Sequence, residues 1–286
     1  MRSMIVAGIV LLGVAACARP DAESEEGAPE PAAVAVVPAE ARFVARDFAF
    51  EGPDTIAAGM TTLVLANEGP NLHHLQLFRL TDGMTVADIE AGLAEMKPTD
   101  PPPPWMIPAG GVNPPDPGAE TRATLMMEPG EYAVLCVVDI PDHVPHLMKG
   151  MIQPLTVMPA SGPPAPAPTE TLTLDLVDYA FGFSAAPTAG HHVVKVVNAG
   201  PQPHEVAFFR LKPGKTMDDF AAWGATYEGE APVESIGGAA AMAVGQVEYV
   251  ELDLTPGEYI AACFVFDGGD GRPHLLHGMV LPFTVT

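Results

Sequence analysis

The sequence is poor in cysteine, in basic residues and in long apolar runs. Its 286 residues include 3 Cys and 13 Lys and Arg, against 36 Asp and Glu, which gives a formal net charge of −23. So few basic residues disfavour nucleic-acid binding, because phosphate contacts need clustered Lys and Arg. No apolar run reaches the ~18–20 residues that a membrane-spanning helix needs, so the sequence predicts no such helix.

Pro and Gly, by contrast, are abundant. The chain contains 32 Pro and 28 Gly, and each Pro inside a helix costs about 3 kcal/mol. A helical bundle is therefore disfavoured. The 48% of apolar residues are enough to build a core, so the chain is not disordered throughout. The composition predicts a turn-rich, all-β protein with more than one domain.

The first 17 residues have the form of a bacterial lipoprotein signal peptide. A basic start precedes the apolar stretch 4–14, which is too short to span a membrane. Val14-Ala15-Ala16-Cys17 resembles a lipobox, in which Cys17 is lipidated and begins the mature chain. An ordinary signal peptide cut near Cys17 is the alternative. Residues 18–41, rich in Pro and acidic residues, are predicted to form a disordered tether. We therefore expect a lipid-anchored protein of the cell envelope or periplasm.

The rest of the chain is an internal repeat. The segment DFAF at residues 47–50 returns as DYAF at residues 178–181, and further ordered matches follow at nearly the same offset. Chance does not give so many matches in order. We therefore expect two domains, residues 42–158 and 169–286, joined by a Pro-rich, semi-rigid linker at residues 159–168.

Each predicted domain has the pattern of a β-sandwich with one short helix. The β-branched runs 61–66 and 191–197 end at Asn-x-Gly-Pro turns, as strands do. Thr-x-x-Asp motifs that begin at Thr85 and Thr216 resemble capping boxes and predict a helix start. About seven short strands in each domain favour a Greek-key sandwich. The predicted fold class is all-β, with two tandem sandwiches and short helical insertions.

Each predicted domain also contains the same four chemistry-bearing residues in the same order. A His lies six residues after the turn Asn, a Cys ends a strand, and a second His is followed five residues later by Met. These residues are His73, Cys136, His146 and Met151 in the first domain, and His204, Cys263, His274 and Met279 in the second. Two His, one Cys and a weakly bound Met are the ligand set of a blue-copper site, which can pass one electron.

On these residues the sequence resembles the cupredoxin family, in particular its plastocyanin- and azurin-like members. Residues 200–205, Gly-Pro-Gln-Pro-His-Glu, resemble the family's Gly-aromatic-Pro-His-Asn segment with one residue inserted, and residues 256–263 resemble the strand that delivers the copper thiolate. The resemblance implies Greek-key sandwiches with type 1-like copper between loops at one end, up to two coppers per chain. The inserts 137–145 and 264–273 are longer than in small cupredoxins and have a hairpin-like composition.

Other interpretations stay open at this point. The two later Cys could be buried as small apolar side chains, or could join in a disulfide between the domains, which an elongated tandem would disfavour. His73 and His204 could simply bond turn carbonyls. His143 or His277 could replace an assigned ligand.

The predicted function is that of an envelope-tethered, two-domain copper protein that carries electrons or copper. The alternative is a copper-free tandem β-sandwich that serves as a binding or scaffolding module. Two-domain cupredoxins that are enzymes would need His-x-His pairs or a His beside the Cys, and the sequence has neither, so we expect no enzyme. The acidic surface is expected to keep a monomer soluble, or to steer a basic redox partner such as a c-type cytochrome.

Overall fold

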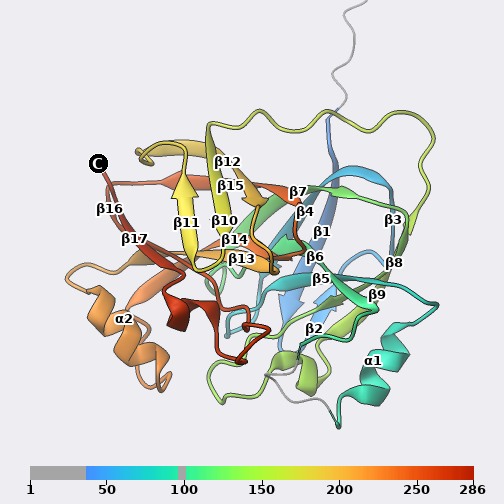
Figure 1. Ribbon diagram of the computed structural model, residues 1–286, viewed down its shortest axis with the longest axis horizontal. Coiled ribbons are helices and arrows are strands. Elements are labelled where there is room, and N and C mark those ends of the chain that lie inside the picture. Colours follow the sequence, from blue (N-terminus) through green and yellow to red (C-terminus); the bar gives the residue numbers. More distant parts are fainter. Residues whose placement is uncertain (1–36, 96–100) are drawn as a thin grey trace, which may run out of the picture. The chain divides into compact units, whose positions relative to one another are not determined.

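The computed structural model describes residues 37–95 and 101–286 (Figure 1), and it confirms the predicted all-β class. The described chain forms two β-sheets, with only short helices beside them. The predicted signal peptide, Cys17 and the tether as far as residue 36 lie outside the described residues. The first strand begins at Ala39, inside the range predicted for the tether. None of the described helices is both long and apolar enough to cross a membrane.

One sheet has eight strands, in the order β11, β10, β12, β15, β7, β4, β1 and β2. In chain order, its strands are β1 (Ala39–Arg46), β2 (Ala49–Glu51), β4 (Gly59–Asn67), β7 (Glu120–Met127), β10 (Leu172–Val177), β11 (Ala180–Phe183), β12 (Gly190–Asn198) and β15 (Val247–Leu254). The predicted strands 61–66 and 191–197 are found within β4 and β12.

The other sheet has nine strands, in the order β17, β16, β13, β14, β6, β5, β8, β9 and β3. In chain order, its strands are β3 (Thr55–Ala57), β5 (Leu75–Leu80), β6 (Met106–Val112), β8 (Gly130–Leu135), β9 (Ile152–Met158), β13 (His204–Leu211), β14 (Val233–Met242), β16 (Gly257–Ala262) and β17 (Val280–Val285).

Both sheets run without a break from the first half (residues 37–158) to the second half (residues 169–286). β7 pairs with β15, and β6 pairs with β14, both antiparallel. In these pairs Ala123 lies opposite Val250, and Val112 lies opposite Ala239. Each of these residues faces its own counterpart in the repeat, at an offset of 127. The two halves therefore pair through equivalent strands, as the subunits of a two-fold dimer do.

The core lies between the inner faces of the two sheets. Along β10, Leu172, Leu174 and Leu176 are buried while the residues between them are more exposed, which is the period of two that strands show. Phe43 from one sheet and Leu77 from the other belong to the same buried cluster. Full burial of such a side chain contributes about 1.5–3 kcal/mol, so this alternation determines which face of each strand turns inward.

Buried polar side chains connect the two halves where their strands meet. The amide of Gln76 donates to the carbonyl of Ala241 and accepts from its N–H, at 2.9 and 2.8 Å. Glu248 is buried, and its Oε1 accepts from the N–H of Gly111 at 2.8 Å. A Cβ at Gly110 would lie 1.4 Å from that oxygen. Only glycine fits at position 110. The buried carboxyl group of Glu248, in the second half, therefore depends on Gly110 and Gly111 in the first half.

The two predicted helices form where their capping boxes placed them. They are α1 (Val86–Gly92) and α2 (Met217–Gly224), with Thr85 and Thr216 at their N-caps. Two 3-10 helices, η1 (His146–Lys149) and η2 (His274–His277), end the inserts. The inserts are not regular hairpins. Residues 137–145 contain no strand, and residues 264–273 contain a single bridge between Phe266 and Pro273.

Candidate metal centres

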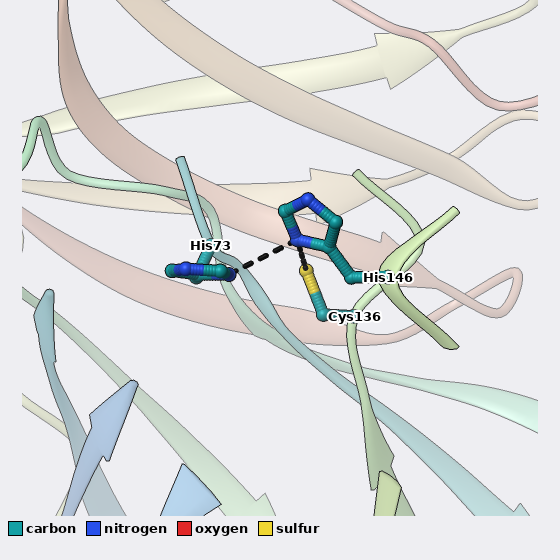
Figure 2. A group of neighbouring side chains, drawn as sticks. All are labelled: His73, Cys136 and His146. Carbon is teal, nitrogen blue, oxygen red and sulfur yellow. Dashed lines mark hydrogen bonds between the residues drawn. The ribbon is translucent and has the colours of Figure 1, made fainter. Parts of the chain in front are cut away.

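Three predicted ligands of the first half meet in one buried group, which we call site 1 (Figure 2). Nδ1 of His146 lies 3.0 Å from Nδ1 of His73 and 3.5 Å from Sγ of Cys136. All three side chains are fully buried. A set of ligand atoms this close, with no water-exposed edge, is the arrangement that a small metal ion requires.

The second half repeats this geometry in site 2. Nδ1 of His274 lies 3.0 Å from Nδ1 of His204 and 3.5 Å from Sγ of Cys263. In each site the three ligand atoms all lie within 4.8 Å of one another. The structure therefore brings together the His and Cys residues that the repeat placed at matching positions.

The ligands come from the same three places in each half. His73 precedes β5 and His204 begins β13, while Cys136 and Cys263 directly follow β8 and β16. The second His of each site is the first residue of its 3-10 helix. The strands therefore fix the first His and the Cys, and the insert fixes the second His.

The predicted Met residues lie next to the other ligands along the backbone. The N–H of Met151 donates to the carbonyl of His146 at 3.0 Å, and the N–H of Cys136 donates to the carbonyl of Met151 at 3.2 Å. Met279 makes the same two bonds with His274 and Cys263. Both Met side chains are fully buried in the core.

Two aspartates that the sequence analysis did not single out hold the first His of each site. Nε2 of His73 lies 2.6 Å from Oδ1 of Asp47, and Nε2 of His204 lies 2.9 Å from Oδ1 of Asp178. A signal for them was present, because Asp47 and Asp178 open the repeated DFAF and DYAF segments, with the same offset of 131 as the two His. A carboxylate that bonds a ligand His is the usual outer contact of a metal site.

These contacts decide which nitrogen of each ring carries a lone pair. In site 1 both Nε2 atoms face acceptors, since Nε2 of His146 lies 3.2 Å from the carbonyl of Ile140. Each Nε2 therefore carries the proton, and each Nδ1 is left with a lone pair. Two lone pairs 3.0 Å apart repel each other in a dry environment, and a metal ion between them removes that repulsion. The donor set of site 1 thus fits a metal.

Comparison with known proteins finds only distant structural likenesses. No protein-family model matches the sequence, and no curated protein matches it. Among solved structures, a dithionite-reduced auracyanin from Roseiflexus castenholzii is 20% identical, over 43% of this chain and 99% of that chain, with a TM-score of 0.30. A blue copper oxidase from Nitrosomonas europaea is 16% identical, over 87% of this chain and 86% of that chain, with a TM-score of 0.28.

A copper nitrite reductase from the same organism is 14% identical, over 88% of this chain and 94% of that chain, with a TM-score of 0.26. These identities and scores leave the assignment of the sites to the geometry of the chain itself. The described residues form an eight-stranded and a nine-stranded β-sheet. Each half carries one His–Cys–His cluster beneath its insert.

Burial dominates the proton equilibria of these two sites. It raises the pKa of the Cys136 thiol to about 12 and also raises the pKa of Cys263. Burial lowers the pKa of all four ligand His, although Asp47 and Asp178 partly offset this for His73 and His204. Without metal the sites therefore hold neutral imidazoles and protonated thiols.

The structure also decides some of the interpretations that were open. Both Cys136 and Cys263 are free, so no disulfide joins the halves. The ring of His143 stacks on Tyr227 with the ring centroids 4.8 Å apart, and His277 contacts Asp270. Neither belongs to a His–Cys–His cluster.

The two sites differ in what surrounds the second His. Phe48 contacts His146 in site 1, with ring centroids 4.8 Å apart, and its counterpart Tyr179 contacts His274 in site 2, at 5.5 Å. Tyr179 donates to Oδ2 of Asp267 at 2.6 Å. The Nε2 atom of His274 has no hydrogen-bond partner among the described residues, unlike that of His146.

We expect a Gly200→Ala change to weaken metal binding at site 2 alone. A Cβ at this position would lie 2.5 Å from Nε2 of His204, so the imidazole must move. Loss of such outer support typically costs 10–100-fold in metal affinity. Gly69→Ala, whose Cβ would lie 2.7 Å from Nε2 of His73, should weaken site 1 instead. Equilibrium dialysis against Cu²⁺ measures both effects.

Gly182→Ala is the matched control, because a Cβ there would meet no described atom within 4 Å. It should leave both sites unchanged. If Gly200→Ala bound copper as tightly as the unaltered protein, His204 would not be a ligand in the observed position.

Copper binding should release protons and strengthen as the pH rises. Metal binds the thiolate, whereas burial keeps the pKa of Cys136 at about 12 and that of Cys263 raised, so both thiols are protonated near neutral pH. Each copper should therefore release about one proton, and affinity should rise about tenfold per pH unit between pH 6 and 8. Calorimetry in buffers of different ionisation enthalpy counts the protons. A pH-independent affinity in this range would show that the thiols are not ligands.

Proposed function

We propose that this chain is a copper protein of the cell envelope that carries electrons, or copper itself, with one type 1-like site in each half. The observation that carries the proposal is the convergence of two Nδ1 atoms and one Sγ in a fully buried group, present twice. Copper bound there would supply one-electron chemistry through the Cu(I)/Cu(II) couple.

The chemistry of the ligands favours copper over zinc. A structural zinc site has four strong ligands in a tetrahedron. Here each half offers three close ligands, and the residue placed beside them by backbone bonds is a Met, whose thioether is a weak donor. The N–H of Glu205 points at Sγ of Cys263 at 3.5 Å. Hydrogen bonds of this kind to the Cys sulfur tune the potential of blue-copper sites.

A carrier function is favoured over an enzymatic one. Three groups of potential metal ligands occur within residues 37–95 and 101–286: the two sites, and a group of Asp267, Asp270 and His277. A second copper centre for substrate chemistry would need further His, and the sequence contains no His-x-His pair. The role of each site is then to hold the metal in a dry pocket and to pass an electron.

The proposed location and partner rest on the sequence. The lipobox at Cys17 and the acidic, Pro-rich residues after it support a lipid anchor followed by a tether. A net charge of −23 supports a basic partner, such as a c-type cytochrome, because opposite charge steers encounter. The proposed setting is therefore the envelope side of a membrane.

Titration of the purified protein with Cu²⁺ should give up to two coppers per chain and an intense thiolate charge-transfer band in the visible spectrum. Cys136→Ser should remove the contribution of site 1, and Cys263→Ser that of site 2, because each thiolate belongs to one site. Met151→Leu and Met279→Leu serve as matched variants. They should retain metal and raise the reduction potential, since only a weak axial donor is lost.

Retention of no metal and absence of the visible band would leave the copper-free sandwich with a binding or scaffolding role. Loss of all copper in Cys136→Ser would show that the ligands are shared between the halves, against the assignment of one set per half.

Cys17→Ser should move the protein from the membrane fraction to the soluble fraction. Lipid chains contribute about 0.8 kcal/mol per buried CH₂, and two or more chains anchor a protein stably. Fractionation of cells followed by detection of the protein measures this. A wild-type protein that is fully soluble without detergent would contradict the lipid anchor.

A further inference from the structure

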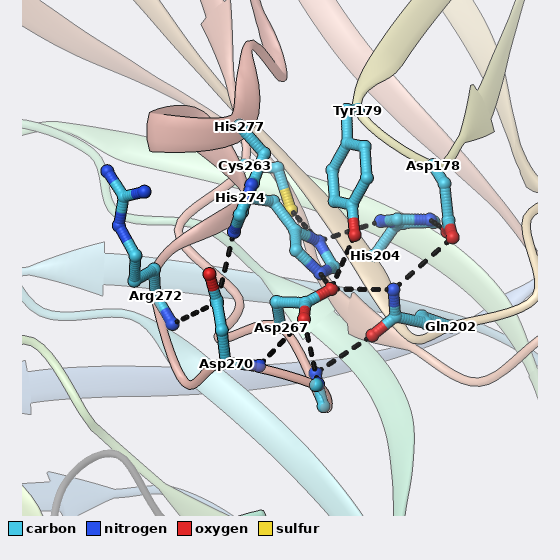
Figure 3. Close-up of polar contacts among 12 residues, drawn as sticks. Asp178, Tyr179, Gln202, His204, Cys263, Asp267, Asp270, Arg272, His274 and His277 are labelled. Carbon is cyan, nitrogen blue, oxygen red and sulfur yellow. Dashed lines mark hydrogen bonds and ion pairs between the residues drawn. The ribbon is translucent and has the colours of Figure 1, made fainter.

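Beside site 2 lies a group of ligating side chains that the copper proposal does not use (Figure 3). Asp267 and Asp270 belong to the insert 264–273, and His277 is the last residue of η2. Their ligand atoms all lie within 4.8 Å of one another, and Nε2 of His277 is 3.1 Å from Oδ1 of Asp270. The exposed fractions of the Asp270 and His277 side chains are 44% and 23%, so a dissolved ion can reach them.

A buried imidazole nitrogen without a partner faces this group. Nε2 of His274 lies 3.8 Å from Oδ2 of Asp267, which is too far for a hydrogen bond. The side chain of His274 is fully buried, and this nitrogen has no partner among the described residues. Leaving a buried polar group without a hydrogen-bond partner is destabilising. A bound species between His274 and the acidic group would supply the missing hydrogen-bond partner.

The first half shows what occupies the equivalent position there. At an offset of 128, the counterparts of Asp270 and His277 are Asp142 and Lys149. The Lys149 ammonium lies 2.8 Å from Oδ1 of Asp142 and 4.4 Å from the centroid of the Phe48 ring. The first half thus carries its own positive charge beside site 1. An imidazole in place of the ammonium offers a lone pair, which a charged Lys lacks.

Hydrogen bonds hold the Asp267 carboxylate in place, as the neighbours of a metal ligand usually do. Its Oδ1 accepts from the N–H groups of Gly269 and Asp270, and its Oδ2 accepts from Tyr179 and Gln202. These donors lower the pKa of Asp267, so its carboxylate stays charged. A metal bound to Oδ2 would take the place of one of its two hydrogen-bond donors. We expect that donor to be Tyr179, whose counterpart in the first half is Phe48, which has no hydroxyl group.

We propose that Asp267, Asp270 and His277 form a site for a divalent cation of borderline character, with Zn²⁺ as the representative metal. Carboxylate oxygen and imidazole nitrogen are ligands that Zn²⁺ accepts, and three protein ligands leave the fourth position to water. That water would be the hydrogen-bond partner of Nε2 of His274. The cation site stands without the proposed function, and only its effect on the copper of site 2 rests on it.

Zn²⁺ titration by calorimetry, with metal analysis after dialysis, tests the site in the full-length protein. The unaltered protein should bind one more Zn²⁺ than Asp270→Asn or His277→Gln, or bind that ion at least tenfold more tightly. Tyr179→Phe should tighten the binding, because it frees a lone pair on Asp267. Asp142→Asn is the matched control at the equivalent position of the first half, and it should leave the Zn²⁺ isotherm unchanged.

The same titration in Cys263→Ser separates this proposal from the copper proposal. The ion should still bind, because none of its ligands belongs to the His–Cys–His cluster of site 2. If Asp270→Asn left Zn²⁺ binding unchanged, or if Asp142→Asn weakened it equally, the cation site would be wrong whatever the protein does with copper.

In the copper-loaded protein, Zn²⁺ should raise the reduction potential of site 2 and leave that of site 1 unchanged. An added positive charge favours the less positive Cu(I) state. Asp270→Asn should abolish this shift. Equal shifts at both sites would indicate binding elsewhere on the acidic surface and would overturn the proposal.

Discussion

The hydrogen bond between an aspartate and the first His determines how each His–Cys–His cluster is arranged. Nε2 of His73 donates to Asp47 and Nε2 of His204 donates to Asp178, so the Nδ1 lone pair of each ring faces the other His and the Cys. Each half then contains two close imidazole nitrogens and a thiol in a fully buried group, and in site 1 both nitrogens carry lone pairs. Such a group stabilises nothing by itself in the absence of metal. The free energy that keeps it in place must come from the sheets around it.

Much of this architecture could be predicted from the sequence because the same motifs occur in both halves of the chain. The equal spacing of His73 and His204 from their turn Asn residues, and of Cys136 and Cys263 from their Pro-Gly-Glu-Tyr segments, placed the ligands at matching strand ends. The helices were predictable because a capping box is a local motif, and the backbone and side-chain bonds of Thr216 and Asp219 form as expected.

Other features depend on distant pairing and leave little trace in local pattern. The residues around Gly110 in the sequence do not indicate that Glu248, far along the chain, packs against it. Asp47 and Asp178 belong to the repeated segments, so the sequence shows that both halves have them. The repeat alone does not show whether such a residue hydrogen-bonds a candidate metal ligand or only packs in the core. The inserts were expected to be hairpin-like, yet the first has no strand and the second has a single bridge. In each, the second His donates its backbone N–H to an early insert carbonyl, that of Val138 at 2.9 Å and that of Val265 at 2.8 Å, and local composition does not reveal this bond.

The pairing of each strand at the junction with its own counterpart bears on how such a chain assembles. A half on its own would leave β6 and β7 as open edges, which are templates for pairing with another chain. Two separate copies could meet through those edges, but only at a rate that depends on their concentration. With residues 159–168 joining the copies, the encounter becomes intramolecular, and the linker sets a fixed effective concentration. Dilution therefore cannot separate the two halves, and the two His–Cys–His clusters stay in one molecule.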